Sequence, residues 1–145
     1  MHMTRQWVVT GAVVASLAAW WLVDNHRLLP ARAQEAYRTV DVTIHDYTFK
    51  LQPTVLKVHE PVRIVLRNTD AVQHGFTSEA LDGLDVRVES DGIITYGRGI
   101  KGLYIDPGHE VEVAFTPTKS GALKFRCDLH PKMKGELAVL TVGAA

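Results

Sequence analysis

The chain has 145 residues, of which 46% are apolar and 22% charged, and this composition allows one ordinary globular domain with an appendage. Sixteen basic and sixteen acidic residues cancel, so the net charge indicates no polyanionic partner and we expect no nucleic acid binding. The single cysteine excludes an internal disulfide and leaves one thiol as a candidate reactive or ligating group.

The N-terminal segment is apolar and carries no charge from Trp7 to Val23. A helix of this length, rising about 1.5 Å per residue, is at the short end of what crosses a hydrocarbon core. The sequence Ala31-Arg-Ala33 resembles a cleavage site but lies far beyond the apolar run, whereas Trp20 and Trp21 suit a membrane interface. We therefore expect residues 1–23 to be a signal anchor or a signal peptide, with the uncleaved anchor favoured. Either one predicts a periplasmic or other extracytoplasmic location.

A polar, proline-containing tether covers residues 24–38, and the pattern then changes to a period of two. Val40, Val42 and Ile44 alternate with polar residues, which is typical of a strand with one buried face. The same pattern predicts strands at 55–58, 62–66, 111–115, 123–127 and 137–142. Turn-forming residues separate these segments, and no helical period follows residue 38. For residues 39–145 we expect an all-β, Greek-key antiparallel β-sandwich, preceded by one N-terminal apolar helix.

The segment from Thr77 to Gly108 breaks this alternation and is rich in glycine. It is too long for a plain hairpin loop, so we expect it to contain a strand or short helix of its own. Two roles stay open. The segment either binds a partner or covers a site, or it is a crossover between the sheets that carries additional structure.

Residues with metal-binding chemistry gather near the C-terminus, where Cys127 is followed at three-residue steps by His130 and Met133. A thiolate, an imidazole and a thioether suit copper, and a second histidine would complete a His2Cys site with a weak axial methionine. His74 is the best candidate for that histidine. Zinc is the alternative, but structural zinc sites use four Cys or His ligands and a thioether binds zinc poorly. A buried structural cysteine is the other alternative, yet it would need no polar loop after it.

The remaining histidines predict no catalytic site. His45, His59 and His109 each lie beside an acidic residue, and we expect them to be surface groups. The sequence shows no Ser-His-Asp arrangement beyond coincidence and no phosphate-binding glycine loop.

The span from about Val40 to Val142 resembles the cupredoxins, or blue copper proteins. Its C-x-x-H-x-x-M loop, with Pro131 after the histidine, is similar to the ligand loop of amicyanin and its plastocyanin-like relatives. The resemblance implies a cupredoxin fold that binds one copper per chain and cycles it between Cu(I) and Cu(II). The ligands that it implies are His74, Cys127, His130 and Met133.

Two further resemblances leave the colour class of the copper open. The stretch around His74-Gly75-Phe76 is similar to the binuclear copper domain of oxidase subunit II, and Cys127-Asp-Leu-His-Pro-Lys132 is similar to nitrosocyanin, a red copper protein. The blue proteins usually carry Asn where this chain has Gly75, and a binuclear site requires a second cysteine that this sequence lacks. The resemblance therefore implies mononuclear copper.

A fixed ligand set acceptable to both oxidation states predicts a carrier of single electrons and not an enzyme. We expect this carrier to be a monomer. Its expected partners are redox proteins such as cytochromes or an oxidase or reductase, and the membrane through residues 7–23. His130 is the expected electron port, with Lys132 and Lys134 as a basic edge. Two other functions stay open: copper delivery or storage, which needs a labile site, and red-copper-type catalysis at a single copper, which needs an open coordination position.

Overall fold

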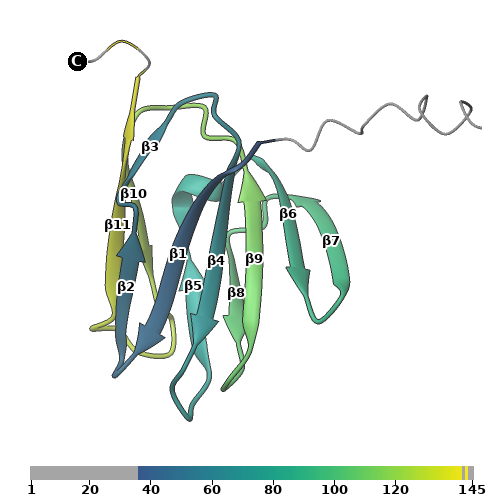
Figure 1. The fold of residues 1–145 in the computed structure, drawn as a ribbon, viewed down its shortest axis with the longest axis vertical. Helices are drawn as coiled ribbons and strands as arrows, with labels where there is room; N and C mark the ends of the chain where they lie inside the picture. Colours follow the sequence, from purple (N-terminus) through teal and green to yellow (C-terminus); the bar gives the residue numbers. More distant parts are fainter. Residues whose placement is uncertain (1–35, 142, 144–145) are drawn as a thin grey trace, which may run out of the picture. The chain divides into compact units, whose positions relative to one another are not determined.

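The computed structural model describes residues 36–141 and 143, and these form two β-sheets packed face to face (Figure 1). The first sheet has six strands in the order β2-β1-β4-β9-β6-β7, and the second has five in the order β3-β11-β10-β5-β8. The strands of the first sheet are β1 (Arg38–His45), β2 (Thr48–Gln52), β4 (Val62–Asn68), β6 (Asp85–Ser90), β7 (Ile93–Arg98) and β9 (Glu110–Phe115). The strands of the second sheet are β3 (Val55–Lys57), β5 (His74–Thr77), β8 (Gly102–Ile105), β10 (Gly121–Arg126) and β11 (Lys134–Leu140). One 3-10 turn, η1 (Glu79–Leu81), follows β5.

The core lies between the two sheets and follows the alternation of the sequence. In β1 the side chains of Val40, Val42 and Ile44 are fully buried, while the residues between them are exposed or half-buried. Leu123 and Leu137 supply the opposite face from β10 and β11, where they are cross-strand neighbours. The expected all-β sandwich of two sheets is confirmed.

The expectation that the sandwich is wholly antiparallel is wrong, because both sheets are mixed. Strand β1 pairs in parallel with β4, and β3 pairs in parallel with β11. After the β1–β2 hairpin the chain forms β3 at the edge of the second sheet and then returns to the first sheet as β4. Side-chain alternation indicates which face of a strand is buried, but carries no information on the direction of its neighbours.

The described part of the chain contains no helix long and apolar enough to span a membrane. The apolar helix expected at residues 7–23 lies outside the described residues, so its existence stays a prediction.

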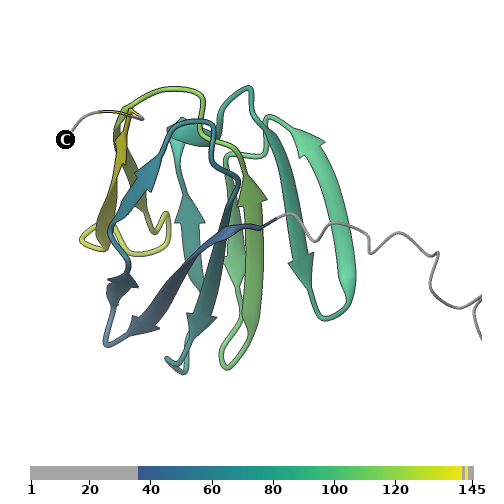
Figure 2. The same ribbon diagram turned by 45° about the horizontal axis from the view of Figure 1, so that its top comes forward.

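The segment from Thr77 to Gly108 contains η1 and the strands β6, β7 and β8, so the expectation of internal secondary structure is confirmed. Strands β6 and β7 form a hairpin that extends the first sheet beyond β9, as Figure 2 shows, whereas β8 returns to the second sheet and pairs with β5. The segment is a crossover between the sheets that adds a hairpin to one of them.

Three aromatic rings fill the core between β2, β5 and β10. The ring of Phe125 lies 4.8 Å from that of Phe76 and 5.1 Å from that of Phe49, between ring centres. On the neighbouring strand Phe125 faces Gly135, and a β-carbon at Gly135 would overlap the Phe125 ring. The glycine therefore makes room for the ring that closes this cluster.

The first prediction concerns this contact. Gly135→Ala should lower the free energy of unfolding by about 1–3 kcal/mol, because the Phe125 ring has to move within a packed core. Urea unfolding of the metal-free protein measures this. In a Phe125→Leu background the same substitution should cost less. An equal cost in both backgrounds would show that the ring is not the cause.

Candidate metal centre

Three of the predicted ligands converge at the end of the sandwich drawn lowest in Figure 1. His74 begins β5, and Cys127 and His130 lie in the loop between β10 and β11. The Cys127 sulfur lies 3.9 Å from Nδ1 of His74 and 3.5 Å from Nδ1 of His130. Both imidazoles therefore direct the same ring nitrogen at the sulfur.

The loop that carries Cys127, His130 and Met133 is closed by its own backbone. The N–H of Cys127 donates to the carbonyl of Met133 at 3.1 Å, and the N–H of Met133 donates to the carbonyl of His130 at 2.9 Å. The Met133 side chain is only 3% exposed, so the structure buries the fourth predicted residue in the same loop. The three-residue spacing thus gives a single tight turn that returns the chain to Cys127.

Asp128 ties this loop to the neighbouring strands. Its carboxylate accepts a hydrogen bond from the Thr77 hydroxyl at 2.5 Å and another from the Arg126 guanidinium at 3.0 Å. Because Thr77 ends β5 and Arg126 ends β10, the loop is fixed to both strands that position the site.

The backbone of β5 also contacts the Cys127 sulfur directly. The N–H of Gly75 donates to that sulfur at 3.1 Å, an arrangement that stabilises negative charge on the sulfur. A β-carbon at Gly75 would lie 3.2 Å from the backbone nitrogen of Asp128 and 3.4 Å from the Tyr104 ring. Glycine therefore lets β5 approach the ligand loop closely.

Asp70 orients the His74 ring. His74 is fully buried, and its Nε2 lies 2.8 Å from the Asp70 carboxylate. With Nε2 donating to a carboxylate, Nδ1 is left as the acceptor that faces the sulfur. Burial alone would raise the pKa of the Asp70 carboxyl, but hydrogen bonds from Tyr47, Asp46 and His74 outweigh it and hold that pKa below its usual value. Asp70 is therefore an anionic support for the imidazole.

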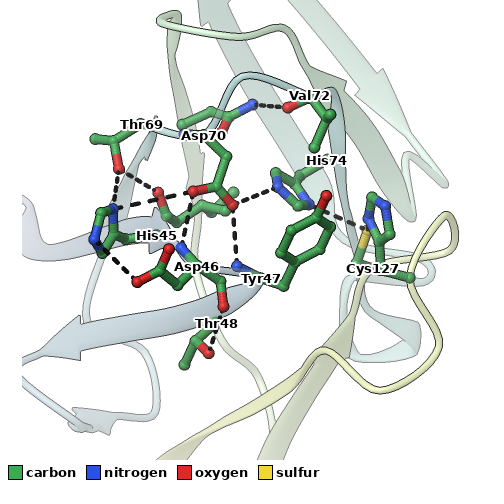
Figure 3. A network of polar contacts seen from close by, with 12 residues as sticks. His45, Asp46, Tyr47, Thr48, Thr69, Asp70, Val72, His74 and Cys127 are labelled. Carbon is green, nitrogen blue, oxygen red and sulfur yellow. Dashed lines mark hydrogen bonds and ion pairs between the residues drawn. The ribbon is translucent and has the colours of Figure 1, made fainter.

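A second group of metal-binding residue types consists of His45, Asp46 and Asp70. Figure 3 shows that these side chains already hold protein partners: His45 lies 3.1 Å from the Thr69 hydroxyl through Nδ1 and 3.4 Å from Asp46 through Nε2. Both carboxylate oxygens of Asp70 accept backbone or imidazole hydrogens. We therefore interpret this group as a hydrogen-bonded support next to the site.

The expectation that His45, His59 and His109 are surface groups is confirmed, since all three are exposed. His109 pairs with Asp91 at 3.2 Å, and not with its sequence neighbour Glu110. Asp70 was not among the predicted site residues, and its only signal in the sequence is a carboxylate four residues before a candidate histidine ligand. Tyr47 was not predicted either, because no sequence pattern connects it with the site.

Comparisons with known proteins agree with this fold. The chain is similar to the copper-resistant cuproprotein CopI of Pseudomonas aeruginosa, with 26% identity over an alignment of 145 positions that covers 76% of this chain and 80% of CopI. A multicopper oxidase from Pseudomonas thermotolerans matches with a TM-score of 0.57 and 17% identity over 72% of this chain and 30% of that structure. One from Pediococcus acidilactici matches with a TM-score of 0.56 and 13% identity over 77% of this chain and 27% of that structure. The chain spans less than half the length of the oxidase structures that it matches, and at this identity the likeness shows the fold alone.

A protein-family match covers more of the chain than any of these similarities. The family described as the cupredoxin-like domain matches residues 12–139, which is most of the sequence. The resemblance drawn from the ligand loop is thereby confirmed at the level of the family, and the chain belongs to the cupredoxin-like domain family.

Proposed function

We propose that this chain is a mononuclear copper protein that carries single electrons. The observation that supports the proposal most directly is the convergence of two imidazole Nδ1 atoms on one buried cysteine sulfur. Cys127 as a thiolate and the Nδ1 atoms of His74 and His130 would hold the metal, and the Met133 thioether would be a weaker fourth donor. Copper bound there supplies the one-electron redox chemistry.

The residues present fit copper better than structural zinc. A structural zinc site wants four Cys or His ligands, whereas this loop offers one thiolate and one imidazole and then a thioether. Within the described residues, one group of possible ligands consists of His74, Cys127 and His130, and no other His, Cys, Asp or Glu belongs to it. This arrangement supports one copper per chain.

The surroundings of these residues favour electron transfer over catalysis. His74 is held by Asp70, and the loop of Cys127 is held by Gly75 and Asp128, so the donors can keep their positions in both oxidation states. His74 is fully buried, whereas His130 is partly exposed and is the ligand through which electrons would pass. Met133 is buried in the same loop and would supply the weak fourth ligand, so we propose a carrier and not an enzyme.

Copper resistance is the second candidate function, because the name of CopI connects a similar protein with it. A protein that delivers or stores copper needs a labile site, and would pass its metal to a metal-free acceptor protein. A carrier would keep its copper through many cycles of reduction and oxidation. Incubation of the loaded protein with a metal-free copper protein distinguishes the two functions.

The second prediction tests the ligand set. The copper-loaded parent should show an intense visible thiolate-to-copper band, and Cys127→Ser should abolish it while the circular dichroism of the sheets is retained. His74→Gly should leave a coordination position that added imidazole fills, which restores the band. His59→Gly is the matched control, because His59 is exposed and has a φ of 62°, which glycine accepts readily. An intense band in the Cys127→Ser variant would contradict the assignment.

The end of the sandwich that carries His130 also exposes apolar side chains and two lysines. Tyr47, Val72, Tyr104 and Leu129 are between 38% and 56% exposed. Lys132 and Lys134 are exposed in and beside the ligand loop. Electron-transfer encounters are small and short-lived, and charges at the rim act mainly on the association rate. We propose that a redox protein with an acidic patch, such as a cytochrome, docks here on a monomer of this chain.

The third prediction tests this docking surface. Lys132→Glu combined with Lys134→Glu should slow electron exchange with such a partner by roughly tenfold at low salt, because both charges would then repel the acidic patch. The effect should fade as the Debye length falls below about 10 Å. Lys119→Glu is the control, since Lys119 lies in the β9–β10 connection at the opposite end of the sandwich. Equal rates for the parent and the double variant in stopped-flow measurements at low salt would show that electrons leave through another face.

We also propose that residues 7–23 export the protein and hold it in a membrane, with the copper domain in the periplasm. The support is the uncharged apolar run and its two tryptophans at the end.

The fourth prediction follows from this proposal. The full-length chain should fractionate with membranes, and a variant without residues 1–35 should be a soluble monomer that still binds copper. Recovery of mature protein that begins at Gln34 in the soluble exported fraction would show a cleaved signal peptide instead.

A further inference from the structure

The turn between β1 and β2 has a backbone conformation that its residues adopt rarely. Asp46 has a φ of 49° and Tyr47 a φ of 56°, so both residues of this two-residue hairpin turn have the left-handed backbone conformation. Such turns favour Asn-Gly, and a bulky residue there is under steric strain. A strained residue that is retained in a structure indicates a function when other contacts hold it in place.

Asp70 holds this turn in place. Its two carboxylate oxygens accept the N–H of Asp46 at 2.8 Å and the N–H of Tyr47 at 3.0 Å. The oxygen that accepts from Tyr47 also lies 2.8 Å from Nε2 of His74. One carboxylate therefore links the strained turn to an imidazole of the metal centre.

The Tyr47 side chain lies against both imidazoles of the centre. Its ring centre is 5.4 Å from that of His74 and 4.9 Å from that of His130, and both contacts are edge-on with an interplanar angle of 84°. The two histidine rings lie 4.8 Å apart. Tyr47 is 52% exposed while His74 is fully buried, so the tyrosine lies between solvent and the histidine (Figure 3).

From these contacts we propose that Tyr47 is a cover over the metal centre. Asp70 fixes the turn by hydrogen bonds, and the turn holds the Tyr47 ring against both imidazoles. It keeps them from rotating and keeps small anions in solvent from reaching the donor atoms between them. This role rests on the proposed copper site and adds the residue that keeps the site closed to exogenous ligands.

Tyr47→Gly separates this role from a merely structural one. Glycine adopts the left-handed conformation without strain, so the metal-free variant should unfold in urea at or above the midpoint of the parent. Tyr47→Phe keeps the ring and removes only the hydroxyl, which makes it the matched control. Tyr47→Asn is a second small variant, because asparagine also tolerates the left-handed region.

The probe is sodium azide, titrated into each copper-loaded full-length protein and followed by visible and electron paramagnetic resonance spectra. The parent and Tyr47→Phe should be unaffected, whereas Tyr47→Gly and Tyr47→Asn should show a saturable spectral change. A chelator should also remove copper from the two small variants faster by about tenfold, since both ring contacts are lost.

Two kinds of result would overturn the proposal. In the first, the parent has the thiolate band, azide changes the spectra of all four proteins or of none, and the chelator removes copper from all four at the same rate. Tyr47 is then not a cover, although the copper site stands. If the parent takes up no copper or lacks the thiolate band, the proposed function fails and the cover fails with it.

Discussion

The carboxylate of Asp70 accepts hydrogen bonds from the backbone of Asp46 and Tyr47 and from the ring of His74. These contacts connect the β1–β2 turn, the β4–β5 connection and the first residue of β5. Because Nε2 of His74 is fixed in this way, Nδ1 has one direction left to face, and that direction is the Cys127 sulfur. The low pKa of Asp70 keeps the carboxylate charged, so the support persists across the ordinary range of pH.

The segments at this end of the sandwich are stabilised in a similar manner, by side chains that satisfy backbone groups. Asn68 is buried at the end of β4, and its amide donates to the carbonyls of Val72 and Ile105 while its oxygen accepts the N–H of Asp70. Asp128 performs the corresponding role for the ligand loop. A buried polar group without a partner is costly, so these bonds allow several polar residues to lie together beside an apolar core. The resulting rigidity is what a carrier of electrons requires.

The ligand loop could be predicted because it is local: the spacing from Cys127 to Met133 is visible in the sequence, and the loop closes on itself. The strands β1, β4 and β9 could be predicted because one face of each is continuously buried. Strand β7 could not be predicted, because all of its residues except Gly97 are exposed and no alternation of buried and exposed residues marks it. The parallel pairs escaped prediction because the direction of a neighbouring strand leaves no trace in a hydrophobic pattern.

The contacts of Tyr47 and Asp70 were also beyond a reading of the sequence, since they join residues more than twenty positions apart. The family to which the chain belongs accounts for the fold. The support from Asp70 and the strained turn at Tyr47 are visible only in the contacts of the folded chain. In the proposed copper site they would hold the donors in place and cover them, and such a site would favour electron transfer over metal delivery.

Copper X-ray absorption spectra of the loaded protein in its oxidised and reduced forms test this account most directly. We expect one copper per chain, bound in both forms by two imidazole nitrogens and one thiolate sulfur with nearly unchanged bond lengths. Loss of an imidazole on reduction, or a new oxygen ligand on oxidation, would contradict a rigid, closed site built for electron transfer.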